Sequence, residues 1–138
     1  MPQLDFQSHP MAEWTRAVDD ATLVILMIET PAAVENLDQI AAVPGFDVLL
    51  VGTNDLCIEM GIPGQPEHPR VVSAFERLVA ACRAHGKYAG LGGVYEPRLI
   101  QRYVELGFRL VLAGNDLPLL LAAAKERAAT VRATALPR

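Results

Sequence analysis

Four short apolar segments divide the chain at similar intervals. Each is rich in Val, Ile and Leu without strict alternation, which is typical of strands buried on both faces of a parallel sheet. The segments are residues 23–28, 48–51, 88–91 and 110–113. The pattern therefore predicts four buried strands.

A helical pattern follows each predicted strand. The predicted helices span residues 32–42, 70–85, 97–106 and 117–132. Gly45, Gly86 and Gly107 each lie between a helix and the next strand, where the residue after a helix often needs positive φ. A strand–helix unit repeated four times predicts parallel strands joined by right-handed crossovers.

These units predict an α/β fold, namely a partial TIM (β/α)8 barrel of four consecutive βα units. A complete barrel usually needs about 250 residues, whereas this chain has 138. We assign residues 21–138 to the half-barrel and residues 1–20 to an N-terminal arm, in which residues 11–18 fit a short helix. Four strands leave one apolar face and two edges uncovered. We therefore expect pairing with a missing first half, self-association, or a small open layer.

Composition narrows the classes of partner. The net charge of −4 argues against nucleic acid, because a phosphate backbone is bound by a basic patch. No apolar run approaches the roughly 20 residues of a membrane span, and residues 1–20 show no secretory signal. The two cysteines, Cys57 and Cys82, are too few for a disulfide framework or a zinc site, so we expect a cytoplasmic location.

Two carboxylates follow neighbouring predicted strands. Glu29 ends the first strand, and Asp55 lies just past the second. Because neighbouring strands are about 4.8 Å apart, the two anions can meet, and they repel unless a cation lies between them. Oxygen ligands suit Mg²⁺ or Mn²⁺. Taken singly, Glu29 equally fits a carboxylate at a helix N-terminus, and Asp55 fits a loop or cap residue.

The turn formed by Gly52, Thr53 and Asn54 leaves backbone N–H groups free. Such groups bind carboxylates. A metal beside an anion-binding turn is what a 2-oxo acid needs, since the metal polarises the keto oxygen and the N–H groups hold the carboxylate. These residues are therefore candidates for substrate binding.

A series of motifs resembles the HpcH/HpaI aldolase/citrate lyase family. They are residues 25–30, 33–36, 43–47 and 52–56, followed by residues 85–87, 90–93 and 107–114, which look like the last two barrel strands. The resemblance covers about residues 22–132. It implies the second half of the barrel of an enzyme similar to 2,4-dihydroxyhept-2-ene-1,7-dioate aldolase.

The resemblance implies a metal-dependent (class II) pyruvate aldolase, a carbon–carbon lyase that acts on 4-hydroxy-2-oxo acids. Its partners would be pyruvate or another 2-oxo acid and an aldehyde. It implies Glu29 and Asp55 as ligands of Mg²⁺ or Mn²⁺, with Co²⁺ as a further candidate, and Gly52, Thr53 and Asn54 as the pyruvate-carboxylate turn. The catalytic residues stay unknown, because the family's base histidine and substrate-binding arginine come from the first half of the barrel. The family's usual Gly-Pro-Ala-Asp turn is Gly-Thr-Asn-Asp here.

Three interpretations of function stay open. The chain is an aldolase fragment with reduced or no activity, a non-catalytic half-barrel that binds metal and oxo acid or serves as an assembly piece, or an enzyme similar to citrate lyase and malyl-CoA lyase. The last lacks an evident basic cluster for coenzyme A. In each case we expect a homo-oligomer.

Other residues with chemical potential have simpler explanations. His9 and His68 are expected to be solvated, although His68 lies in the long loop that could approach the metal. His85, beside Gly86, is expected to cap a helix C-terminus. Cys57 is expected to be packed.

Three further features are also given structural roles. Cys82 lies on a predicted helix without an acid–base partner. Residues 90–93 lack the helix spacing of a dinucleotide fingerprint and predict a tight strand exit. Asn115 and Asp116 resemble Asn54 and Asp55 but are expected to cap the last helix.

Overall fold

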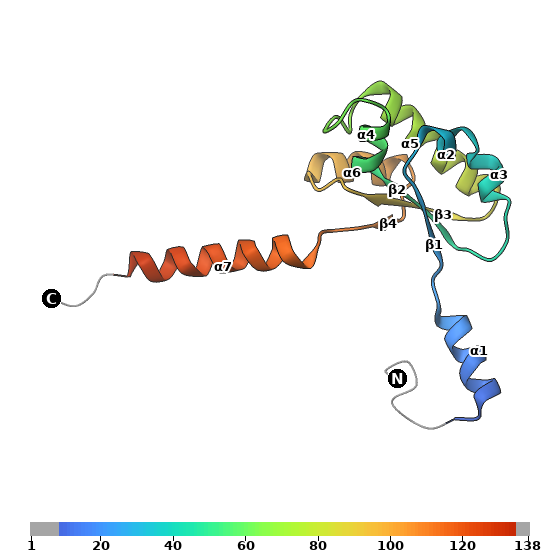
Figure 1. Cartoon of the computed structure of the whole chain (residues 1–138), viewed down its shortest axis with the longest axis horizontal. Helices are drawn as coiled ribbons and strands as arrows, with labels where there is room; N and C mark the ends of the chain where they lie inside the picture. The colour runs from blue at the N-terminus through green and yellow to red at the C-terminus, as the bar shows by residue number, and fades with distance from the viewer. Residues whose placement is uncertain (1–8, 135–138) are drawn as a thin grey trace.

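The computed structural model describes residues 9–134, and its centre is one parallel sheet. The strands lie in the order β1-β2-β3-β4, as seen in Figure 1. Their bounds are Ile25–Ile28 for β1, Val48–Gly52 for β2, Tyr88–Gly92 for β3 and Leu110–Val111 for β4. Ile28 is level with Val51, and Gly52 with Gly92. The predicted strands and their parallel pairing are confirmed.

Seven helices occur in the described residues. They are α1 (Met11–Ala21), α2 (Pro31–Glu35), α3 (Leu37–Ala41), α4 (Thr53–Glu59), α5 (Pro69–Ala84), α6 (Pro97–Leu106) and α7 (Asp116–Ala133). The short helix expected at residues 11–18 is present and extends to Ala21. Gly45, Gly86 and Gly107 have φ of 92°, 66° and 136°, as expected for residues that follow helices.

Two helical assignments were wrong in detail. The helix predicted over residues 32–42 is interrupted at Asn36, whose side chain donates to the Ala32 carbonyl at 2.8 Å. An amide that bonds its own backbone in this way competes with regular helix geometry. Helix α4, of seven residues, occupies the start of the segment 52–69, which we predicted as a long loop.

Helices α2 to α6 cover one face of the sheet, as Figure 1 shows. The core there centres on Phe75 of α5, Tyr103 of α6 and Phe108. Phe75 lies edge-on to both other rings, with centroid distances of 4.8 and 5.4 Å, a geometry that adds to simple burial. The sheet contributes one set of alternate residues, among them Leu49 and Leu91, which are fully buried.

On the opposite face of the sheet, a glycine stands at position 90 in place of a residue with a side chain. A Cβ atom on Gly90 would come within 2.7 Å of Leu50 Cδ1, so the Leu50 side chain lies across the Gly90 backbone. Val48 and Leu50 do not belong to the buried cluster beneath the helices. In β1, Ile25 and Met27 keep 37% and 53% of their surface exposed. Val48 and Leu50 are nevertheless only 2% and 4% exposed, so the uncovered part of this face lies at β1.

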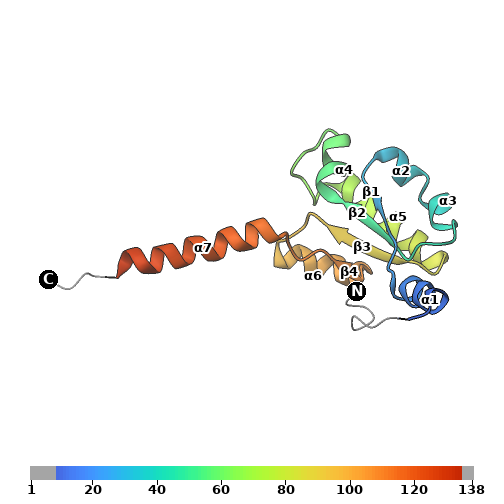
Figure 2. The ribbon, with the colours of Figure 1, turned by 60° about the horizontal axis from the view of Figure 1, so that its bottom comes forward.

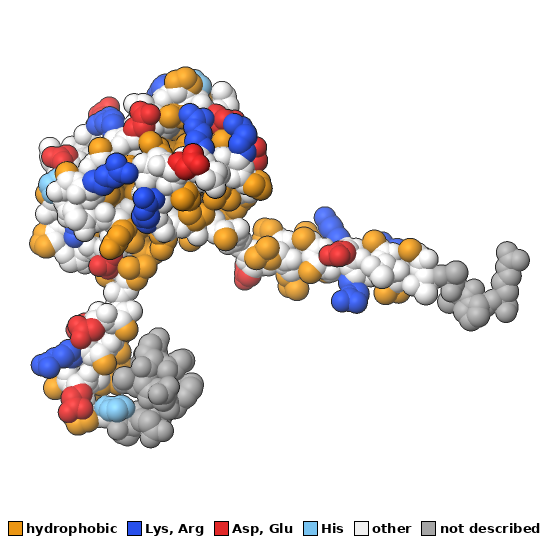
Figure 3. All heavy atoms as spheres, turned by 180° about the vertical axis from the view of Figure 1, so that it is seen from behind, with side chains coloured by type: hydrophobic (Ala, Val, Ile, Leu, Met, Phe, Trp, Pro, Cys, Tyr) orange, Lys and Arg blue, Asp and Glu red, His pale blue; other side chains and the backbone are white. Residues whose placement is uncertain are grey.

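Helices α1 and α7 contribute no buried residue to the fold. Both extend away from the body in two views (Figures 1 and 2). Figure 3 shows hydrophobic side chains along α7. Leu117 and Leu120 of α7 are each 69% exposed. Within residues 9–134, no helix is both long enough and apolar enough to cross a membrane.

We predict that the purified chain self-associates. Covering about 400 Å² of this apolar surface would contribute roughly 10 kcal/mol, which is comparable to the cost of association, about 4–15 kcal/mol. Static light scattering should therefore give a mass above the 14.9 kDa of one chain at micromolar concentration. Replacing Leu117 and Leu120 by Asp should shift the mass toward one chain. The matched control is Thr130→Asp on the same helix, and a stable wild-type monomer would contradict the prediction.

Candidate metal and oxo-acid site

The side chain of Glu29 extends from the end of β1 to the end of β2. It directly follows Ile28, which is level with Val51, so Glu29 is level with Gly52. A Cβ atom on Gly52 would come within 2.8 Å of both Glu29 Cγ and Glu29 Oε1. The carboxylate therefore occupies the space that any larger residue at position 52 would fill. The absence of a side chain at Gly52 is what allows Glu29 to lie there.

Helix α4 begins at once after Gly52 and carries Asp55 in its first turn. The Asp55 side chain is exposed, and Glu29 is partly exposed. The structure thus brings both predicted ligands to the same end of neighbouring strands. Mg²⁺ is usually bound by one or two carboxylates of the protein, because it keeps several water molecules or substrate oxygens as its other ligands.

The donor set fits a hard divalent ion with an incomplete protein shell. Among residues 9–134, no group of three or more His, Cys, Asp or Glu side chains could hold a metal. Glu29 and Asp55 would therefore leave coordination positions for water or for the oxygens of a ligand. This arrangement differs from a closed structural site, in which the protein supplies every ligand.

A cavity of about 290 Å³ opens at the ends of β2 and β3. It is lined by Met27, Leu50, Gly52, Thr53, Asn54, Asp55, Gly92, Gly93, Tyr95, Leu112 and Asn115. All three residues of the predicted carboxylate turn belong to this wall. Gly93 has a φ of +80°, and a Cβ atom there would lie 3.1 Å from Asn54 Nδ2. Glycine at position 93 therefore permits both the turn and the close approach of Asn54.

Thr53 is the buried polar residue of this wall. Its side chain is in the interior, with the residue 1% exposed, and Oγ1 has no hydrogen-bond partner within residues 9–134. A buried hydroxyl without a partner costs about 1–3 kcal/mol. A ligand oxygen in the cavity is one group that could remove this cost.

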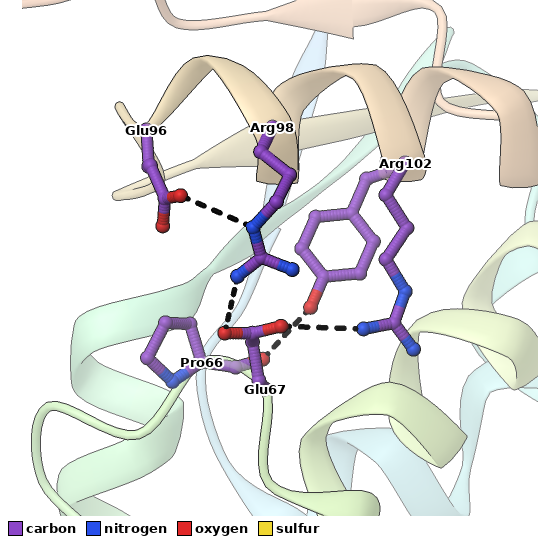
Figure 4. Close-up of polar contacts among 6 residues, drawn as sticks. Pro66, Glu67, Glu96, Arg98 and Arg102 are labelled. Atoms are coloured by element: carbon purple, nitrogen blue, oxygen red, sulfur yellow. Dashed lines mark hydrogen bonds and ion pairs between the residues drawn. The ribbon is translucent and has the colours of Figure 1, made fainter.

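Loop residue Glu67 joins the segment after α4 to helix α6 (Figure 4). Arg98 donates to Glu67 at 2.8 Å and to Glu96 at 3.2 Å, and Arg102 donates to Glu67 at 3.5 Å. The hydrogen bond from Arg98 lowers the pKa of Glu67 below its usual value. The ion pair therefore stabilises the fold at pH values above the ordinary pKa of a glutamate. This stabilisation is lost as the pH falls through the lowered pKa of Glu67.

A buried tyrosine of α6 makes a second contact with the loop after α4. The Tyr103 hydroxyl donates to the Pro66 carbonyl at 2.9 Å, as Figure 4 also shows. Burial raises the pKa of Tyr103, so the phenol stays a donor. The contacts of Glu67 and Pro66 with α6 join residues 31 to 37 positions apart, and the sequence carried no local signal for them.

The three histidines lie outside the cavity wall. His9 is exposed, as expected. His68 Nδ1 accepts from Arg70 N at 3.2 Å and caps the start of α5, so this nitrogen is engaged in structure. His85 is the C-cap of α5, as predicted, and its Nε2 lies 2.9 Å from Asp38 Oδ1.

The two cysteines are free, buried thiols. Packing was expected for Cys57, and Cys82 lies on α5, a helical position that the sequence predicted. Burial raises the pKa of Cys57, and it raises the pKa of Cys82 to about 11. The Cys82 thiol donates to the Tyr88 carbonyl at 3.5 Å. Thiols in this state are poor nucleophiles and poor metal ligands.

Asn115 does not cap α7 through its side chain, contrary to our expectation. It occupies the N-cap position, but it makes no side-chain cap hydrogen bond. Asp116 instead accepts from Leu117 N at 2.8 Å. Asn115 and Tyr95 line the cavity together with the predicted turn residues. We expected Asn115 only to cap the helix, and Tyr95 was not among the predicted site residues.

Comparison with known proteins identifies the family of the chain. The family model described as HpcH/HpaI aldolase/citrate lyase matches residues 4–123. The chain is 42% identical over 132 residues to a 4-hydroxy-4-methyl-2-oxoglutarate aldolase of Hapsidospora irregularis, covering 94% of this chain and 48% of that protein. It is 40% identical over 124 residues to a 4-hydroxy-2-oxo-heptane-1,7-dioate aldolase of Salmonella paratyphi C, covering 86% and 47%.

A solved structure gives the same result for the fold. An HpcH/HpaI aldolase of Desulfitobacterium hafniense superposes with a TM-score of 0.78 at 30% identity, covering 96% of this chain and 51% of that one. The four βα units therefore correspond to half of that enzyme's chain. The protein belongs to the HpcH/HpaI aldolase/citrate lyase family. It spans about half the length of the curated relatives named above, and the match includes most of the segment predicted as an N-terminal arm.

Proposed function

We propose that this chain supplies the metal-binding and carboxylate-binding half of a divalent-metal-dependent pyruvate aldolase site. Glu29 and Asp55 hold Mg²⁺ or Mn²⁺, and the Gly52, Thr53 and Asn54 turn holds the carboxylate of a 2-oxo acid. The observation that carries the proposal is the Glu29 carboxylate lying across Gly52, directly before the helix turn that bears Asp55. The names of the aldolase relatives support the reaction class.

The described residues divide into distinct roles around the cavity. Backbone N–H groups at the start of α4 are oriented for an anion, and the Thr53 hydroxyl gains a partner when a carboxylate oxygen binds. Met27, Leu50 and Leu112 form the apolar part of the wall. When bound, the divalent ion supplies Lewis-acid polarisation of the keto oxygen, which favours an enolate.

Proton transfer has no assigned residue within this wall. A general base must lie within hydrogen-bond reach of the proton that it removes, and none of the described histidines lines the cavity. The wall therefore accounts for binding and polarisation of a 2-oxo acid. The base and the aldehyde partner belong to parts of the site that these residues do not form.

Pyruvate titration in the presence of saturating Mn²⁺ tests the proposed site. Thr53→Val removes the buried hydroxyl while keeping its shape, and we expect pyruvate affinity to fall roughly 3- to 10-fold, the effect of one hydrogen bond. Affinity for Mn²⁺ should be unchanged, because Thr53 is not a proposed metal ligand. Thr22→Val, at the end of α1, is the matched control. Failure of the wild-type chain to bind pyruvate with Mn²⁺ present would contradict the proposal.

A further inference from the structure

A second cavity lies at the opposite end of the sheet from the proposed metal and oxo-acid site. It has a volume of about 200 Å³, and its wall comes from the end of α5, the start of β3 and the connection from α6 to β4. Tyr88 and Ala89, on this wall, are the first residues of β3, whereas the proposed site includes Gly92, the last residue of that strand. The two cavities share no residue.

Three basic side chains line this second cavity, one from each part of its wall. Arg83 belongs to α5, Lys87 directly precedes β3, and Arg109 directly precedes β4. Among the described residues, the lining includes no Asp or Glu. None of the three cations takes part in an ion pair within residues 9–134. Like charges gathered in this way repel one another, and an anion between them offsets the repulsion.

Backbone carbonyl groups hold the two arginines in place. Arg83 Nη2 donates to the Leu106 carbonyl at 3.2 Å. Arg109 Nη1 donates to the carbonyls of Val104 and Phe108 at 3.0 and 2.9 Å. These bonds cap the C-terminal end of α6, where a positive charge is favourable, and they use one nitrogen of each guanidinium group. The other two nitrogens of each group make no hydrogen bond within residues 9–134, so both arginines retain donors for a ligand.

A glycine lets Arg83 lie against the chain between α6 and β4. A Cβ atom on Gly107 would come within 2.6 Å of Arg83 Nη2 and within 2.7 Å of Val79 Cγ1. Gly107 also has a φ of +136°, a conformation that residues with a side chain rarely adopt. Any larger residue at position 107 would therefore displace the guanidinium group from the cavity wall.

Lys87 and two apolar residues complete the wall. The Lys87 ammonium donates to the Phe46 carbonyl at 2.6 Å and lies 4.4 Å from the centroid of the Phe46 ring. An ammonium has three donors, so this bond leaves two of them. Val79 and Ala89 are each only 3% exposed. Because apolar side chains screen charge less than water does, a ligand beside them is attracted more strongly than at an open surface.

We infer that this cavity binds a small tetrahedral dianion, either inorganic phosphate or the phosphoryl group of a monoester, between Arg83 and Arg109. One arginine is enough to pair with both oxygens of a planar carboxylate. Two guanidinium groups from different elements instead suit an oxyanion whose oxygens point in several directions. The Lys87 ammonium adds a third positive charge. This anion site is independent of the proposed function, because the two cavities have no residue in common.

Titration of inorganic phosphate into the metal-free 138-residue chain tests the anion site. Isothermal titration at constant ionic strength should show saturable binding, and phosphate should raise the unfolding temperature. Arg83→Gln and Arg109→Gln should each weaken phosphate binding at least about 10-fold, because hydrogen bonds to charged groups are the stronger ones. Arg109→Lys keeps the charge that caps α6 and should weaken binding less than Arg109→Gln. Circular dichroism without phosphate verifies that each variant is folded.

The matched control is Arg127→Gln on α7, outside the cavity. It removes the same charge from the chain and should leave phosphate affinity unchanged. An equal loss of affinity in Arg127→Gln would show a general charge effect and overturn the site. The absence of saturable phosphate binding, or equal affinity in the wild type and in both cavity variants with glutamine, would also overturn it.

Three competing ligands identify the bound group. Tighter binding of inorganic phosphate than of glycerol 3-phosphate assigns the free ion, and the reverse order assigns a monoester; either result supports the site. Tighter binding of succinate than of both would overturn the choice of a tetrahedral dianion. Excess pyruvate should leave phosphate affinity unchanged. Competition by pyruvate would place the phosphate at the carboxylate turn after β2 and overturn the inference.

Discussion

The chain alone is expected to cleave a 4-hydroxy-2-oxo acid with little or no turnover, even with saturating Mg²⁺. The described cavity wall carries the carboxylate turn and Asp55, but it contains no histidine. Loss of general acid–base catalysis typically costs about 10²–10⁴-fold in rate. The base histidine and the arginine implied by the family resemblance have no counterpart among these residues.

Electrostatic effects lower the expected rate further. Charge stabilisation in the transition state is usually the largest single catalytic contribution, and it weakens where water enters. Exposed apolar residues of β1, such as Met27 on the cavity wall, show that this side of the site is open to solvent in one chain. Polarisation of the keto oxygen by a metal would persist but would be screened.

Coupled detection of pyruvate provides the measurement. The wild-type chain, the Asp55→Ala variant and a sample with the metal chelated should all give the same background rate. Turnover of about one per second, an ordinary enzymatic rate, that disappears in Asp55→Ala would contradict the prediction. It would show that a base lies within this chain. Tyr95, on the cavity wall, and His68, in the loop after α4, would then be the first residues to replace.

The sequence predicted the sheet well because its signals are local. Buried strands of parallel sheets are continuous apolar runs, and the glycines after α3, α5 and α6 marked where helices end. The same reasoning placed Glu29 and Asp55 at one edge, since residues that follow neighbouring parallel strands share an end of the sheet. The structure places Glu29 against Gly52 and Asp55 in the first turn of the helix that follows Gly52, while their binding of a metal stays a prediction.

The features that the sequence did not reveal depend on contacts between distant segments. The bond of Arg98 with Glu67 joins residues 31 positions apart. Tyr95 lines the cavity directly after Val94, which is buried in the core cluster, and no local pattern encodes that burial. Helix α4 was missed because a seven-residue helix carries too little periodicity to be recognised.

The second prediction with a large expected effect concerns metal affinity after loss of a proposed ligand. Glu29→Ala and Asp55→Ala each remove one of the two proposed carboxylate ligands. Losing a group that merely orients a ligand costs about 10- to 100-fold in metal affinity, so loss of a ligand itself should cost at least about 100-fold. Gly52→Ala should also weaken binding, because its Cβ atom would lie 2.8 Å from Glu29 Oε1 and displace the carboxylate.

Isothermal titration of the chain with Mn²⁺ tests the central claim most directly. The matched control is Asp116→Ala, which removes an aspartate from the first turn of α7, outside the cavity wall. We predict saturable binding to the wild type and to Asp116→Ala, and binding at least about 100-fold weaker in Glu29→Ala and in Asp55→Ala. Equal Mn²⁺ affinity in the wild type and in both ligand variants would contradict the assignment of Glu29 and Asp55 as the metal site.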